Sequence, residues 1–112
     1  IKRPREEDDD VSKQESTLDR VHFLSHKNLA TIYYKLGGKE NLSKAIEHYY
    51  RALDLNNTNI IVWHNLATCL IHLEHYLTAR IVLEQMILIE PNYWDAYYDL
   101  IALLFKLRDY EE

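Results

Sequence analysis

The chain has 112 residues, a length that corresponds to one domain. Hydrophobic residues make up 47% and charged residues 28%, which excludes a chain that is disordered throughout. The net charge of −5 argues against binding to the phosphate backbone of a nucleic acid, and no apolar run has the length of a membrane span. Cys69 is the only cysteine, which excludes a disulfide framework and favours a reducing compartment.

Residues 1–16 differ in composition from the rest of the chain. Lys2, Arg3 and Arg5 are followed by an acidic run at residues 6–10, and no apolar stripe accompanies them. Because this segment has no apolar groups to bury, folding it would gain little free energy, so we predict a disordered tail or linker. Two functional interpretations stay open beside it: an acidic docking segment for a basic partner, and a weak nuclear-import signal in the basic cluster.

Residues 17–112 carry apolar side chains at helical spacing. Trp63, Leu66 and Leu70 lie on one helical face, and Ala79 and Leu83 begin a second stripe after a short break. Helices joined by a short turn pack antiparallel. The pattern predicts an all-α chain without strands, with helices at about residues 17–36, 42–55, 60–73, 76–89 and 93–106.

The helical pattern recurs along the chain. Residues 28–31 read Asn-Leu-Ala-Thr, and the same four residues return at 65–68, 37 positions later. In the second helices, Ala45 and Ala79 are 34 positions apart. We therefore place three extra residues in a turn at residues 37–42, where Gly37 and its neighbouring glycine end the first helix.

Residues 60–91 resemble the tetratricopeptide repeat (TPR) family. The resemblance rests on Trp63, Leu66, Ala67, Leu70, Ala79, Leu83, Met86 and Pro91. It implies an antiparallel helix-pair solenoid, a TPR-like right-handed superhelix of about two and a half repeats at residues 23–59, 60–93 and 94–112. The third repeat is cut after its first helix, and a solenoid unit cannot bury its face alone. We therefore expect exposed apolar surface around Ile101 and Leu104, and a chain that is part of a longer array.

A narrower resemblance covers residues 23–110. The acidic stretch, the Lys-Asn-Leu-Ala sequence at residues 27–30, Pro-Asn-Tyr-Trp at residues 91–94 and Leu-Arg-Asp-Tyr at residues 107–110 are similar to the N-terminal region of the calcineurin-binding protein cabin family. These proteins are repeat scaffold subunits of the HIRA histone-chaperone complex. The resemblance implies a nuclear scaffold for replication-independent histone deposition; a cytoplasmic location is the alternative.

No pattern of residues in this sequence is typical of catalysis. A Gly-rich phosphate loop, a Gly-x-Ser-x-Gly sequence and a Walker motif are all absent. His22 and His26 have a spacing that can bind zinc on a helix, but no cysteine or carboxylate completes a tetrahedral set. Packing with one polar contact is the simpler interpretation of His26, and Cys69 is interpreted as a small hydrophobe. We predict no enzyme, no cofactor and no metal site.

The first helix of each repeat lines the concave surface of such an array, and this groove is the predicted binding site. By the repeat register, its partner-binding residues are Lys27, Asn28, Thr31, Tyr34, His64, Asn65, Thr68, Asp95, Tyr98 and Asp99, with Ile71, Ala102 and Phe105 also turned inward. Repeats that grip a C-terminal carboxylate use Lys, Asn, Asn, Lys and Arg. Asp95 and Asp99 replace the two cations at the end of that set, which disfavours a carboxylate ligand.

The predicted partners are other proteins, with an extended or basic segment in the groove, and adjoining repeats of the same longer chain. No direct contact with nucleic acid or membrane is expected. The alternative function is a peptide-recognition or substrate-binding TPR module attached to an enzyme, because Asn-Leu-Ala also resembles the repeats of O-linked N-acetylglucosamine transferase. Asn28 and Asn65 have two open roles: binding a peptide backbone, or bonding the neighbouring helix.

Overall fold

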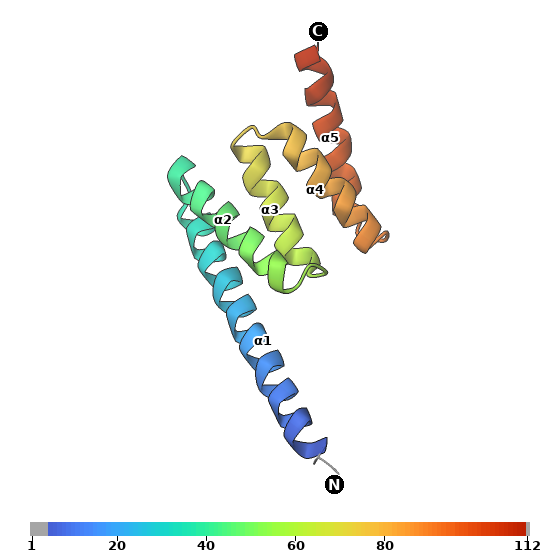
Figure 1. Ribbon diagram of the computed structural model, residues 1–112. Helices are drawn as coiled ribbons and strands as arrows, with labels where there is room; N and C mark the ends of the chain where they lie inside the picture. The colour runs from blue at the N-terminus through green and yellow to red at the C-terminus, as the bar shows by residue number, and fades with distance from the viewer. Residues whose placement is uncertain (1–4, 112) are drawn as a thin grey trace.

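The structure is a computed structural model that describes residues 5–111, and the side chains of residues 16–108. The helices in this range are α1 (Arg5–Leu36), α2 (Lys39–Leu55), α3 (Ile60–His72), α4 (Tyr76–Ile89) and α5 (Trp94–Glu111), and the range contains no strand. Each helix packs against the next one in the chain, so the five form a row of antiparallel neighbours (Figure 1). The predicted all-α helix-pair fold is confirmed.

The first helix begins earlier than the sequence pattern indicates. α1 starts at Arg5, so the predicted start at Thr17 is wrong. Residues 5–16 contain neither Gly nor Pro, and their acidic residues lie near the N-terminal end of the helix, where the helix dipole favours negative charge. The backbone therefore continues as a helix without an apolar stripe, and α1 extends well past α2 (Figure 1). The division of the chain at residue 16 stays a prediction, and residues 1–4 lie outside the described residues.

The connection between α1 and α2 is shorter than predicted. Gly37 and Gly38 have φ angles of 73° and 87°, a left-handed conformation that suits glycine and ends α1 as expected. Lys39 already belongs to α2, which has 17 residues where α4 has 14. The three extra residues therefore lengthen α2 instead of the turn, which corrects the sequence interpretation. Glu40 in the first turn of α2 is favourable for the helix dipole.

The break between α3 and α4 is confirmed at Glu74 and His75. The N–H of His75 donates to the Leu70 carbonyl at 2.8 Å, and the N–H of Glu74 donates to the Ile71 carbonyl at 3.0 Å. This pair of bonds is the Schellman motif, which usually has glycine at its left-handed position. Here that position is Glu74, with a φ of 61°.

The last helix ends later than predicted. α5 continues to Glu111, so the expected end near Lys106 is wrong. Residues 107–111 contain no glycine or proline, so the local sequence does not interrupt the helix before Glu111.

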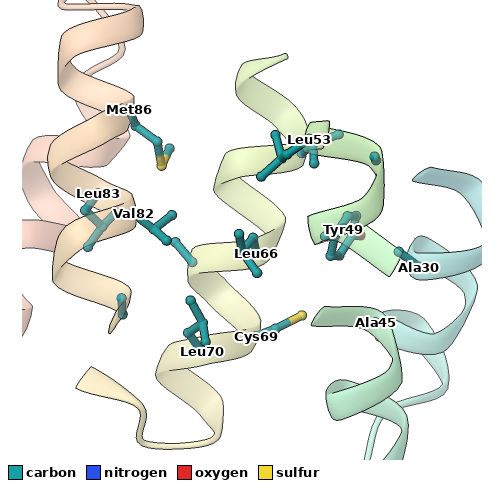
Figure 2. Close-up of a cluster of buried hydrophobic side chains, with 14 of the residues drawn as sticks. Ala30, Ala45, Tyr49, Leu53, Leu66, Cys69, Leu70, Val82, Leu83 and Met86 are labelled. Carbon is teal, nitrogen blue, oxygen red and sulfur yellow. The ribbon is translucent and has the colours of Figure 1, made fainter. Parts of the chain in front are cut away.

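The core lies along both sides of α3. Figure 2 shows α3 between α2 and α4, with Cys69 on the side that faces α2 and Leu70 on the side that faces α4. The buried side chains that the repeat pattern predicts are Ala30, Ala45, Tyr49, Ala52, Leu66, Ala67, Leu70, Ala79, Leu83 and Met86. Trp63 is only half-buried, and its indole N–H donates to the Asn57 carbonyl at 2.8 Å.

The apolar surface expected on α5 is present. Ile101 is 54% exposed and Leu104 is 41% exposed, whereas Ala96 and Leu103 are buried in the core. α5 therefore packs along one side and leaves other apolar side chains in solvent. None of the described helices is both long and apolar enough to cross a membrane.

Candidate protein-binding site

The ten predicted groove residues lie on α1, α3 and α5, the first helix of each repeat, and we call this set the inner wall. It comprises Lys27, Asn28, Thr31 and Tyr34 on α1, His64, Asn65 and Thr68 on α3, and Asp95, Tyr98 and Asp99 on α5. Two small networks of side chains connect these helices. They also determine which members of the wall keep their polar groups free.

The first network links α1, α2 and α3 through Tyr49. The Thr31 hydroxyl donates to the Lys27 carbonyl at 2.8 Å, and the Tyr49 hydroxyl lies 3.1 Å from the Thr31 oxygen. Because Thr31 has already used its proton, Tyr49 donates to Thr31. The Tyr49 oxygen also accepts a hydrogen bond from the side chain of Asn65. Tyr49 is fully buried, and burial raises the pKa of its hydroxyl, while the bonds to Thr31 and Asn65 act in the opposite direction.

This network separates the two groove asparagines. Asn65 is half-buried and bonded to the neighbouring helix, whereas Asn28 is exposed. Of the two roles left open for these residues, the intramolecular one fits Asn65. Thr68 has a similar internal partner, because its hydroxyl donates to the His64 carbonyl at 3.0 Å.

The second network links α3 with α5. The Tyr93 hydroxyl lies 2.8 Å from Nδ1 of His64, and the two rings meet edge to face with centroids 5.6 Å apart. On the other side of the imidazole, Nε2 lies 3.7 Å from Oδ2 of Asp99. Burial raises the pKa of the Asp99 carboxyl, the charge of His64 opposes this shift, and the charge of Asp95 adds to it. Sequence reasoning missed Tyr93, because no spacing rule pairs residues 29 positions apart.

The α5 end of the inner wall is the most open. Asp95 is exposed and Tyr98 is 72% exposed. Among residues 16–108, neither side chain makes a hydrogen bond or an ion pair with another residue. Phe105, which the repeat register also turns inward, follows this part of the wall on α5 and is 63% exposed. A partner at this end would meet two carboxylates and two aromatic rings.

His22 and His26 on α1 do not form a metal site together, and His26 packs against α2 instead. His26 Nδ1 lies 3.2 Å from Nδ1 of His48 on α2, the two rings stack, and Tyr33 stacks on the same His48 ring. His22 is exposed and does not join them. In the described part of the chain, no three His, Cys, Asp or Glu side chains come close enough to hold a metal ion. Burial raises the pKa of the Cys69 thiol to about 11, so it is not a reactive thiolate.

The comparisons with known proteins agree with this architecture. A family model described as the CABIN1 N-terminal domain matches residues 3–111. The chain belongs to the CABIN1 N-terminal domain family. The chain is 30% identical over 92 residues to calcineurin-binding protein 1 of Arabidopsis thaliana, an alignment that covers 82% of the chain and 5% of that protein. The resemblance to the cabin family is therefore confirmed.

The repeat fold of the chain has further relatives. Over 55 residues it is 46% identical to a TPR repeat-containing protein of Methanocaldococcus jannaschii, covering 48% of the chain and 10% of that protein. A solved structure, the second TPR of Spaghetti (RPAP3) bound to the HSP90 peptide SRMEEVD, is similar with a TM-score of 0.74 and 21% identity. The match covers 86% of this chain and 85% of that one. The TPR-like fold is therefore confirmed.

Proposed function

We propose that this chain is a non-catalytic scaffold that binds another protein along its inner wall. The observation that supports this most is the contrast between the two ends of the wall. On α1 and α3, Thr31, Asn65 and Thr68 use their polar groups inside the domain. On α5, Asp95 and Tyr98 point their polar groups at solvent, so this is where a partner gains new interactions.

The charge of the open end determines which partner it suits. Asp95 and Asp99 are four residues apart, one turn of α5, so their carboxylates repel each other and a cation relieves that repulsion. Carboxylate oxygens accept hydrogen bonds and donate none when ionised, so they suit backbone N–H groups and basic side chains. The inner wall therefore binds an extended, basic segment.

The peptide bound to the structural relative has the opposite character. SRMEEVD contains two glutamates and ends in aspartate. At the α5 end of this wall, such a peptide would place its carboxylates near Asp95 and Asp99. Like charges brought together in this way lower affinity and exclude wrong partners. This chain accordingly has a different preference from its relative.

A peptide-binding experiment tests this function. We would measure the fluorescence anisotropy of a labelled arginine-rich peptide of about ten residues, which spans roughly 33 Å when extended. SRMEEVD is the matched acidic peptide. The basic peptide should bind the chain and SRMEEVD should not, and added salt should weaken binding because the charges are at the surface. Equal binding of both peptides, or binding of SRMEEVD alone, would contradict the proposal.

In the cell, this scaffold belongs to a nuclear histone-chaperone assembly of the HIRA type. Membership in the CABIN1 N-terminal domain family supports this, and so does the acidic end of the wall, because the partners in such an assembly include basic segments. The tagged full-length protein should co-purify with histone-chaperone subunits from nuclear extract, as identified by mass spectrometry. A variant with Asp95→Lys and Asp99→Lys should lose a partner that is held by the wall. Recovery only from the cytoplasm, attached to an enzyme, would favour the alternative function.

A further inference from the structure

Along the inner wall, α5 differs from α1 and α3 in the exposure of equivalent side chains. Phe105 is 63% exposed, whereas Ile71 and Tyr34, its equivalents in the earlier repeats, are half-buried against the core. Tyr98 is 72% exposed, whereas its equivalent His64 is bonded to a neighbouring tyrosine. Among residues 16–108, the free aromatic surface on this side of the molecule therefore lies on α5.

These aromatic side chains share one face of α5. Asp95, Tyr98, Ala102 and Phe105 are spaced three, four and three residues apart, which places them along one side of a helix. Tyr98 and Phe105 are two turns apart, about 10 Å along the axis, and the small side chain of Ala102 lies between them. α5 packs against α4, and Leu103 on α5 is buried in the core, whereas the four residues of the aromatic face are all exposed, so this face is not part of the core.

Acidic groups border the aromatic face. Asp95 is exposed and forms no ion pair among residues 16–108. Oδ2 of Asp99 lies 3.7 Å from Nε2 of His64, a distance too long for a hydrogen bond. A bound cation would reach these carboxylates and also the face of the Tyr98 ring, an arrangement that attracts arginine and lysine. The charges thus define which partner can cover the aromatic face.

We propose that α5 is the anchoring part of the inner wall, and that it binds a partner segment in which a basic residue adjoins a large aliphatic residue. This proposal rests on the proposed function. The aliphatic side chain lies over Ala102 between the rings of Tyr98 and Phe105. The basic side chain pairs with Asp95 and Asp99 beside it. On α1, the exposed Asn28 adds a contact to the partner's backbone, whereas Thr31, Asn65 and Thr68 already have partners within the domain.

Peptide pairs and protein variants together test this inference on the full chain. The probe is a labelled peptide of glycine and serine, about ten residues long, that carries arginine next to leucine; a second peptide has serine in place of the leucine. The leucine should tighten binding by about fivefold or more, as burial of an anchor side chain does. Tyr98→Ala and Phe105→Ala should each remove most of this difference. Asp95→Asn with Asp99→Asn should weaken both peptides equally.

Matched variants control for general stickiness and for folding. Leu104→Ala removes an exposed apolar side chain from another side of α5, and Asp54→Asn removes an exposed acid from α2. Both should bind the peptides like the wild type, and all variants should keep the far-ultraviolet circular dichroism of the wild type. If the peptides bind but Asn28→Ala lowers affinity while Tyr98→Ala does not, the anchor is not on α5 and the proposed function stands. If neither peptide binds, both proposals are wrong.

Discussion

The buried hydroxyl of Tyr49 makes a sharp test of how the inner wall is held together. It donates to Thr31 on α1 and accepts from Asn65 on α3, so a single oxygen connects three helices. The side chain is fully buried, so no water replaces a partner that is removed. Asn65 therefore stabilises the fold, and its substitution should lower the stability of the domain.

The expected magnitudes follow from the number of bonds lost. Tyr49→Phe removes two hydrogen bonds and leaves the Thr31 oxygen and the Asn65 amide without their partner, which should lower the free energy of unfolding by about 1.5–3 kcal/mol. Asn65→Ala removes one of the same bonds and should cost about 1–2 kcal/mol. Because the two substitutions share that bond, the double variant should be less destabilised than the sum by about 0.5–1.5 kcal/mol.

Urea denaturation followed by far-ultraviolet circular dichroism measures these differences. Asn28→Ala is the matched control, because Asn28 is the exposed equivalent of Asn65 in the first repeat. It should change the free energy of unfolding by less than about 0.5 kcal/mol. The reasoning is refuted if Asn65→Ala changes the free energy of unfolding as little as Asn28→Ala does. It is also refuted if the changes in that free energy caused by Tyr49→Phe and Asn65→Ala simply add.

Two other features give predictions about stability. Glu74→Gly should raise the free energy of unfolding by up to about 1 kcal/mol, because Glu74 has a φ of 61° and glycine adopts this conformation without strain; a lower urea midpoint would contradict this. The pKa of His48 lies below its usual 6.5, chiefly because of burial and then because of the charges of His26 and Arg51. The folded state therefore binds fewer protons than the unfolded state, so stability should be full above about pH 6.5 and should fall as the pH decreases through that value. His48→Gln should flatten this dependence, and an unchanged pH profile in urea titrations would exclude His48 as its source.

The sequence by itself determined the helix pairs and their core faces. The helical spacing of Trp63, Leu66 and Leu70, and the 34-residue recurrence of Ala45 and Ala79, are enough to identify the helix pairs and the core-facing side of each helix. This works because the direction of a side chain from its own helix axis depends only on its position along that helix. By the same rule, the sequence predicted that Asp95 belongs to the inner wall.

Helix ends were predicted less well. The starts of α1 at Arg5 and α2 at Lys39, and the end of α5 at Glu111, all differ from the sequence interpretation. The sequence pattern marks a helix only where it has an apolar face to bury, whereas a polar segment without glycine or proline can extend that helix further. At Glu74, conversely, packing of α3 and α4 imposes a left-handed residue that the local sequence does not indicate.

Only the tertiary structure decided which groups of the wall remain free. Tyr49 binds Thr31 from 18 positions away, Tyr93 binds His64 from 29 positions away, and these pairs come from different helices. A hydrogen bond requires its two atoms to lie within about 3 Å of each other, and that distance depends on how far apart the helices pack and how they are offset. A repeat register gives neither quantity, so the sequence alone treats Asn65 and Tyr98 as equal members of the wall. The packed structure gives Asn65 a partner and leaves Tyr98 exposed to solvent.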